Sequence, residues 1–141
     1  MKTYRELDVW KKAVDMVVLV YELTREFPPE EKYGLMSQMQ RAAVSVPANI
    51  AEGYGRVHRG GYVHHLSIAR GSLAELETHI TIAVRLNFLV REKATILWNM
   101  TQDVGKMLSC LIRSLQRNPG EIVMFDKLDP KPETRNPKGS I

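Results

Sequence analysis

The sequence has a single cysteine and no long apolar run, and both shortages limit the class of protein it encodes. Cys110 has no second cysteine to pair with, so an internal disulfide framework is excluded. The longest uncharged apolar stretch, Met16–Tyr21, is far shorter than the roughly 20 residues that a membrane span requires. The charged N-terminus also lacks the apolar core of a signal peptide. We therefore expect a cytoplasmic protein that does not enter a membrane.

Catalytic and metal-binding signatures are missing as well. The sequence contains no G-x-S-x-G, H-E-x-x-H or phosphate-binding G-x-x-x-x-G-K-[ST] motif. Glu75 and His79 have the i, i+4 spacing of metal ligands but no third partner, and the adjacent His64 and His65 diverge by about 100° on a helix. Cys110 borders an apolar seam, where a thiol packs as a small hydrophobic group. We expect no enzyme activity, no cofactor and no metal.

What the sequence does contain is a helical period. From about residue 4 to residue 26, apolar side chains recur every three or four positions, which places them on one face of a helix: Leu7, Trp10, Val14, Val17, Tyr21 and Thr24. Thr3 and Glu6 have the spacing of a capping box at its start. Phe27-Pro28-Pro29 ends it, because proline cannot continue a helix and constrains the residue before it.

The same period appears in three further segments. One segment begins at Leu35, and its apolar period ends at Gly53-Tyr54-Gly55. It contains Pro47, which should kink the helix. A heptad seam then runs from Tyr62 to Ala83, preceded by Gly60-Gly61 and ended by Asn87. The last segment runs from Leu97 to Leu115 and stops before Asn118-Pro119-Gly120.

Four long helices and the lack of strand alternation define the expected fold. A chain of 141 residues is long enough for one domain with its own core. Short turns between the helices predict an all-α, up-down-up-down antiparallel four-helix bundle over residues 1–118. Residues 119–141 hold four of the seven prolines and little apolar surface, so this segment is expected to be a flexible tail.

The first helical segment carries a second apolar stripe, rotated by about 100° from the first: Val9, Ala13, Met16, Val20, Leu23 and Phe27. Residues Ile96, Met100, Met107 and Cys110 form a partial counterpart in the last segment. A monomeric bundle needs one apolar face on each helix, so the extra stripe favours a subunit interface. A broad core face would explain the same pattern.

Positive charge is concentrated in two places. The chain has a net charge of +4, and residues 91–118 hold five Lys and Arg against two Asp and Glu. Lys106, Arg113 and Arg117 point outward from the predicted helix, while Arg56 and Arg59 form a basic loop between the second and third helices. These five residues are the candidate RNA or DNA phosphate contacts. A solvated helix face remains the alternative.

Two other interpretations of single side chains follow from the same pattern. Tyr54, next to the basic loop, is available to stack on a base. Glu75 flanks the apolar seam, and Arg41 or Arg70 is the expected partner in an ion pair that fixes the register of the helices.

Several stretches resemble the bacterial 23S rRNA intervening-sequence protein family. They are Leu7 and Trp10 near the start, Phe27-Pro28, E-K-Y-G-L at 31–35, S-Q-M-Q-R-A-A-V-S-V-P-A-N-I-A-E-G at 37–53 and A-R-G-S-L-A-E-L-E-T at 69–78. The resemblance implies a four-helix bundle that assembles into a homopentamer, without catalytic residues. Some members are encoded within 23S rRNA genes, and a more distant group binds nucleic acid and a reverse transcriptase.

Two functions remain open at this stage. The first is a non-enzymatic oligomer that binds RNA or DNA through basic surface residues. The second is a protein-interaction scaffold, such as an accessory partner of a reverse transcriptase. The charge pattern favours the first, and the resemblance agrees with both.

Overall fold

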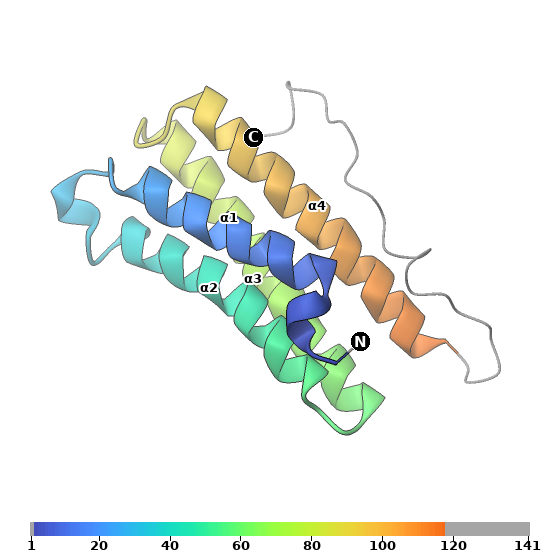
Figure 1. The fold of residues 1–141 in the computed structure, drawn as a ribbon. Coiled ribbons are helices and arrows are strands. Elements are labelled where there is room, and N and C mark those ends of the chain that lie inside the picture. The colour runs from blue at the N-terminus through green and yellow to red at the C-terminus, as the bar shows by residue number, and fades with distance from the viewer. Residues whose placement is uncertain (1, 118–141) are drawn as a thin grey trace.

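The computed structural model describes residues 2–117, and these residues form a bundle of four long helices (Figure 1). Each long helix packs against two others, so that α1 contacts α2 and α4, and α3 contacts the same two. Two short 3-10 turns accompany the long helices, and the elements in order are η1 (Tyr4–Glu6), α1 (Asp8–Thr24), η2 (Pro29–Glu31), α2 (Leu35–Tyr54), α3 (Arg59–Arg85) and α4 (Arg91–Gln116). The predicted all-α antiparallel bundle is confirmed for the described residues. The tail predicted for residues 119–141 lies outside them.

The start of the first helix differs from the prediction. Thr3 and Glu6 do act as caps: Thr3 Oγ1 accepts from the Arg5 N–H at 3.3 Å, and the Glu6 carboxylate accepts from the Lys2 N–H at 3.0 Å. They cap the separate turn η1, however, because Leu7 is extended (φ −71°, ψ 123°) and interrupts the helix. Helix α1 therefore begins at Asp8.

The third and fourth helices are joined by the expected turn at Asn87. This residue has φ 60°, in the left-handed region where asparagine is one of the few tolerated side chains. The Phe88 N–H donates to the Ala83 carbonyl at 2.9 Å and closes the end of α3. At its other end α3 begins at Arg59 and runs through Gly60 and Gly61, which were expected to precede it.

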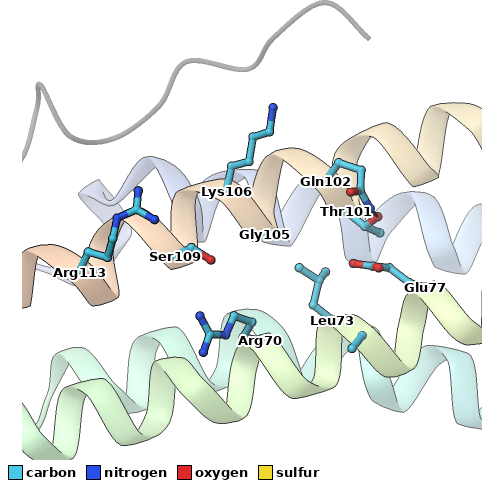
Figure 2. Close-up of a pocket in the computed structure, with 10 residues that line it drawn as sticks. Arg70, Leu73, Glu77, Thr101, Gln102, Gly105, Lys106, Ser109 and Arg113 are labelled. Carbon is cyan, nitrogen blue, oxygen red and sulfur yellow. Dashed lines mark hydrogen bonds between the residues drawn. The ribbon is translucent and has the colours of Figure 1, made fainter. Parts of the chain in front are cut away.

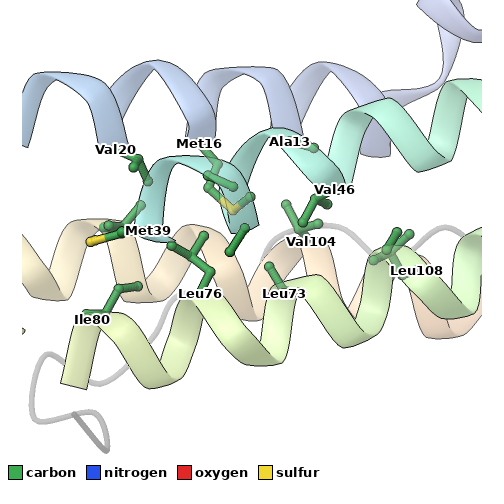
Figure 3. Packing of buried hydrophobic residues seen from close by; sticks show 14 of the residues in the cluster. Ala13, Met16, Val20, Met39, Val46, Leu73, Leu76, Ile80, Val104 and Leu108 are labelled. Atoms are coloured by element: carbon green, nitrogen blue, oxygen red, sulfur yellow. The ribbon is translucent and has the colours of Figure 1, made fainter. Parts of the chain in front are cut away.

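The core is built on the second apolar stripe of α1, which corrects the prediction that this stripe forms a subunit interface. Ala13, Met16 and Val20 are fully buried and point toward side chains of the other three helices (Figure 3). The first stripe is only partly covered, and Tyr21 is 42% exposed. Both stripes are apolar, so the sequence pattern alone could not tell which one faces the other helices.

The α2–α3 pair combines small residues with a polar seam. Ser45 and Ser72 hydrogen-bond across the pair at 2.8 Å, and His65 Nδ1 lies 3.1 Å from Asn49 Oδ1. Pro47 is buried within α2, which continues unbroken from Leu35 to Tyr54. Where Gly53 faces α3, an added Cβ would lie 2.9 Å from the His65 Cβ, so the two helices can meet here only through glycine.

None of the helices within residues 2–117 is both long enough and apolar enough to cross a bilayer.

Candidate nucleic-acid interface

The fold brings the two predicted groups of basic residues to the same end of the bundle. Arg56 lies in the connection between α2 and α3, and Arg59 is the first residue of α3. Arg113 lies in the last turn of α4, and Arg117 follows that helix. These segments meet directly, because Arg59 Nη1 donates to the Arg117 carbonyl oxygen at 3.3 Å. Lys106 lies seven residues before Arg113 on α4, which is about 10 Å farther along the bundle.

This end of the molecule carries more positive charge than the other. We call it the basic end and define it by residues 2–8, 52–59 and 113–117. It holds six Lys and Arg against three Asp and Glu, for a net charge of +3. The opposite end, residues 22–32 and 85–93, holds five of each and has no net charge. The positive charge is therefore polarised along the bundle, and the sequence did not show this because the contributing segments are far apart in the chain.

Arg56 is paired with a carboxylate of its own segment. Its Nη2 atom lies 2.7 Å from Glu52 Oε1, one turn earlier in the chain, and both side chains are exposed. Exposed pairs of this kind contribute less than about 1 kcal/mol, so a phosphate can replace the carboxylate at little cost. The stem of Arg56 runs close to Gly61, since a Cβ added at position 61 would lie 3.1 to 3.7 Å from its Cβ, Cγ and Cδ atoms.

A groove between α3 and α4 extends from the basic end toward the middle of the bundle (Figure 2). Its volume is about 480 Å³, and three cationic side chains lie along it: Arg70, Lys106 and Arg113. Arg70 projects from α3 and Arg113 from α4, and both line the groove (Figure 2). Two of the five candidate residues of the sequence analysis, Lys106 and Arg113, therefore line this groove, and Arg70 lines it with them.

Arg70 was assigned another role from the sequence, and that prediction is wrong. No ion pair joins Glu75 to Arg41 or Arg70; the ion pairs formed among residues 2–117 are Lys12–Asp103, Arg56–Glu52 and Lys93–Glu26. Glu75 is exposed, whereas Arg70 lines the α3–α4 groove. The groove depends on the register of α3 and α4, in which Gly105 packs closely on Leu73, and sequence spacing on α3 alone does not reveal this register.

The inner end of the groove is acidic. Glu77 on α3 points toward Thr101 and Gln102 on α4 (Figure 2). Burial raises the pKa of the Glu77 carboxyl group above its ordinary value, and a hydrogen bond with Gln102 opposes this shift. Glu77 also forms no ion pair with any side chain of residues 2–117. The groove thus has cations at one end and an unpaired carboxyl group at the other.

Replacing Glu77 by glutamine should stabilise the fold at neutral pH. The pKa of Glu77 is raised above 4.5 in the folded protein, so on raising the pH this carboxyl group ionises in the unfolded state first. The free energy of unfolding therefore falls as the pH rises from 4.5 through the pKa of the folded state. Above that interval the ionised carboxylate destabilises the folded state, and glutamine removes this penalty while keeping the size of the side chain. Thermal unfolding should show a higher Tm for Glu77→Gln at pH 7, and the difference should shrink below pH 4.5. A lower Tm at pH 7 would contradict this account of the groove.

Tyr54 lies within the basic end, and its ring contacts α3. Its ring meets that of Tyr62 edge-to-face, with centroids 6.0 Å apart and an interplanar angle of 84°. Burial, together with the nearby Tyr54, raises the pKa of Tyr62 to about 12. The contact fixes the orientation of the Tyr54 ring, and its stacking on a base remains a prediction.

The histidines do not form a cluster with other metal-ligating side chains. In the part of the chain that the structure describes, no three His, Cys, Asp or Glu residues lie close enough to hold an ion. The rings of His64 and His65 are 5.5 Å apart in an edge-to-face arrangement. His79 is separate from them, and burial lowers its pKa while the nearby Glu75 opposes this shift.

These features define an antiparallel four-helix bundle with a basic end and a charged groove. The chain belongs to the 23S rRNA-intervening sequence protein family, whose family model matches residues 5–110. This match includes Arg56, Arg59 and Lys106 but ends before Arg113 and Arg117.

The fold is also similar to that of a solved structure. It is a crystal structure of a protein of unknown function from the S23 ribosomal protein family of Bacteroides thetaiotaomicron. The TM-score is 0.70, with 23% sequence identity over 74% of this chain and 98% of that protein. At this identity the similarity shows the fold alone. A search of curated protein sequences gave no match.

Proposed function

We propose that this protein is a non-enzymatic oligomer that binds RNA or DNA, mainly through phosphate contacts of its basic end and the neighbouring α3–α4 groove. The observation that carries the proposal is the meeting of the α2–α3 connection with the end of α4, through the contact between Arg59 and Arg117. A row of cations continues from there along the groove, through Arg113, Lys106 and Arg70.

The arrangement suits a phosphate backbone better than a small anion. Lys106 and Arg113 are about 10 Å apart along α4, and the other cations extend the row beyond them. These cations lie along an open groove rather than around a closed pocket. A nucleic acid presents phosphates at regular intervals over such a length, and each neutralised phosphate releases a bound counterion. The family and the crystallised relative are named after ribosomal RNA and a ribosomal protein, which agrees with this choice.

A salt titration tests the proposal. The affinity of the full chain for a labelled single-stranded RNA, measured by filter binding or gel shift, should fall steeply as the salt concentration rises. Each phosphate contact contributes about 0.7 to the slope of log K against log salt for a single strand. Binding that is absent, or that does not depend on salt, would reject the proposal. A protein partner retained in a pull-down after nuclease treatment would instead favour the scaffold function.

Assembly is the second part of the proposed function. Val18 and Tyr21 of α1 and Val44 of α2 are 52%, 42% and 42% exposed, and we call these three exposed apolar side chains the α1–α2 face. The α1–α2 pair lies across the bundle from the α3–α4 pair that forms the groove. Copies of the chain that associate through the α1–α2 face leave the groove and its cations accessible.

The expected assembly is a homopentamer, as the family resemblance implies. Light scattering at micromolar concentration should give five times the 16.1 kDa mass of the chain. The double variant Val18→Lys and Tyr21→Lys places like charges at the apolar contact between copies. Light scattering should therefore give a lower mass for this variant than for the wild-type assembly. The fold should be retained, since both positions are exposed. A wild-type protein that remains a single protomer would contradict this part of the proposal.

A further inference from the structure

We infer that the α3–α4 groove binds one unstacked guanine nucleotide of a single strand, with the base edge on Glu77 and the adjoining phosphate between Arg70 and Arg113. This inference rests on the proposed function and adds a base preference to it. Three features of the groove carry the argument: the separation of its charges, its apolar middle and the chemistry of the Glu77 carboxylate.

The separation of charges matches a nucleotide. Arg70 and Glu77 are seven residues apart on α3, which corresponds to about 10 Å along the groove. A nucleotide of similar length has its negative charge at the phosphate and hydrogen-bonding groups at the far edge of its base. The cations at one end of the groove and the carboxyl group at the other are complementary to these two parts (Figure 2).

The middle of the groove is apolar. Leu73 and Ala74 line it from α3, and Gly105 lines it from α4 without a side chain. A Cβ at position 105 would lie 3.3 Å from Leu73 Cδ2, so glycine lets α4 pack closely on Leu73, and the floor of the groove is an apolar surface. Bases removed from a stack are commonly held against apolar side chains in this way.

Glu77 selects guanine among the four bases. An ionised carboxylate only accepts hydrogen bonds. Guanine presents two neighbouring donors, N1–H and the N2 amino group, on its Watson–Crick edge. Adenine, cytosine and uracil each place an acceptor next to their single donor, and that acceptor would repel the carboxylate. The hydrogen bond between Gln102 and Glu77 orients the carboxylate for this pairing. Gln102 in turn donates to Thr101 Oγ1 at 3.3 Å.

A single-base series tests the inference. The probes are labelled ten-nucleotide RNAs with nine uridines and one central G, A or C, together with the all-uridine strand, at one fixed salt concentration. The strand with G should bind about tenfold more tightly than the others, as expected for a bidentate base contact. Equal binding of all four strands would overturn the inference and leave the proposed function standing. Failure of every strand to bind would overturn both.

Two variants separate base recognition from phosphate binding. Glu77→Gln places an amino group opposite the guanine donors, so it should abolish the preference for G without weakening binding of the all-uridine strand. Arg70→Gln should weaken binding of all four strands and leave the preference for G unchanged. Glu75→Gln, on the exposed face of α3, is the matched control and should alter neither quantity. A preference for G that survives Glu77→Gln would overturn the assignment.

Free GMP distinguishes a strand from a free nucleotide as the occupant. GMP should displace the G-containing strand only at a large excess, because it lacks the neighbouring phosphates that contact the basic end. Displacement at a concentration equal to that of the strand would overturn the assignment of the groove to a base within a strand.

Discussion

Leucine in place of Gly53 is expected to lower the free energy of unfolding by about 3 kcal/mol, the upper part of the range for overpacking a close contact. At this position α2 meets α3 with almost no space between them. An added Cβ alone would lie 2.9 Å from His65 Cβ and 3.1 Å from the Tyr62 carbonyl oxygen. Because one of these neighbours is backbone, a rotamer change cannot relieve the clash, and the helices must separate. Urea unfolding at a fixed protein concentration measures the effect.

Gly71→Leu is the matched control for this change. Gly71 also lies within a helix, but no atom is found within 4 Å of a Cβ added there. Leucine should therefore raise the free energy of unfolding by about 0.5–1 kcal/mol, since glycine is a poor helix former. Similar effects at positions 53 and 71 would mean that α2 and α3 do not approach each other as closely as the structure shows.

Removing three positive charges near the basic end should weaken RNA binding about a hundredfold at 0.1 M salt. The triple variant Lys106→Gln, Arg113→Gln and Arg117→Gln removes three proposed phosphate contacts from α4 and the residue after it. For a single strand the slope of log K against log salt should decrease by about 2, because each contact contributes about 0.7. Glutamine keeps most of the length of each side chain, so packing changes are small. Fluorescence anisotropy across a salt series measures both quantities.

The control for this variant removes the same charge from the opposite end of the bundle. Arg25, Lys32 and Arg85 are exposed and lie within the segments that carry no net charge. Their replacement by glutamine lowers the total charge by the same amount, so any effect of net charge alone appears in both variants. Equal losses of affinity would show that the phosphates are not held at the basic end.

The helices themselves were predictable because local sequence determines them. The period of the apolar residues marked the four helical segments. Pro28 and Pro29 marked the turn after the first segment, and Asn87 marked the turn after the third. The exact start of the first helix was not predictable, since Thr3 and Glu6 cap a separate turn and only the extended backbone of Leu7 reveals the break. Which stripe of α1 is buried was also open, because both stripes have the same helical period and are largely apolar.

The candidate site was predictable in part. Local charge in the sequence identified five basic residues: Arg56, Arg59, Lys106, Arg113 and Arg117. An antiparallel bundle then places the α2–α3 connection near the end of α4. Arg70 and Glu77 were not recognised, because a groove depends on the relative rotation and register of two helices. The sequence shows Arg70 as a helical cation like any other, and only the position of α4 places it in one groove with Arg113.

Cross-linking of bound RNA to the protein tests the central claim most directly. A strand containing photoreactive 4-thiouridine is irradiated with the full chain, and the cross-linked peptides are identified by mass spectrometry. The account predicts adducts within residues 2–8, 52–59, 70–77 and 101–117, which include the basic end and the groove. Adducts concentrated in residues 22–32 and 85–93, at the opposite end, would contradict it.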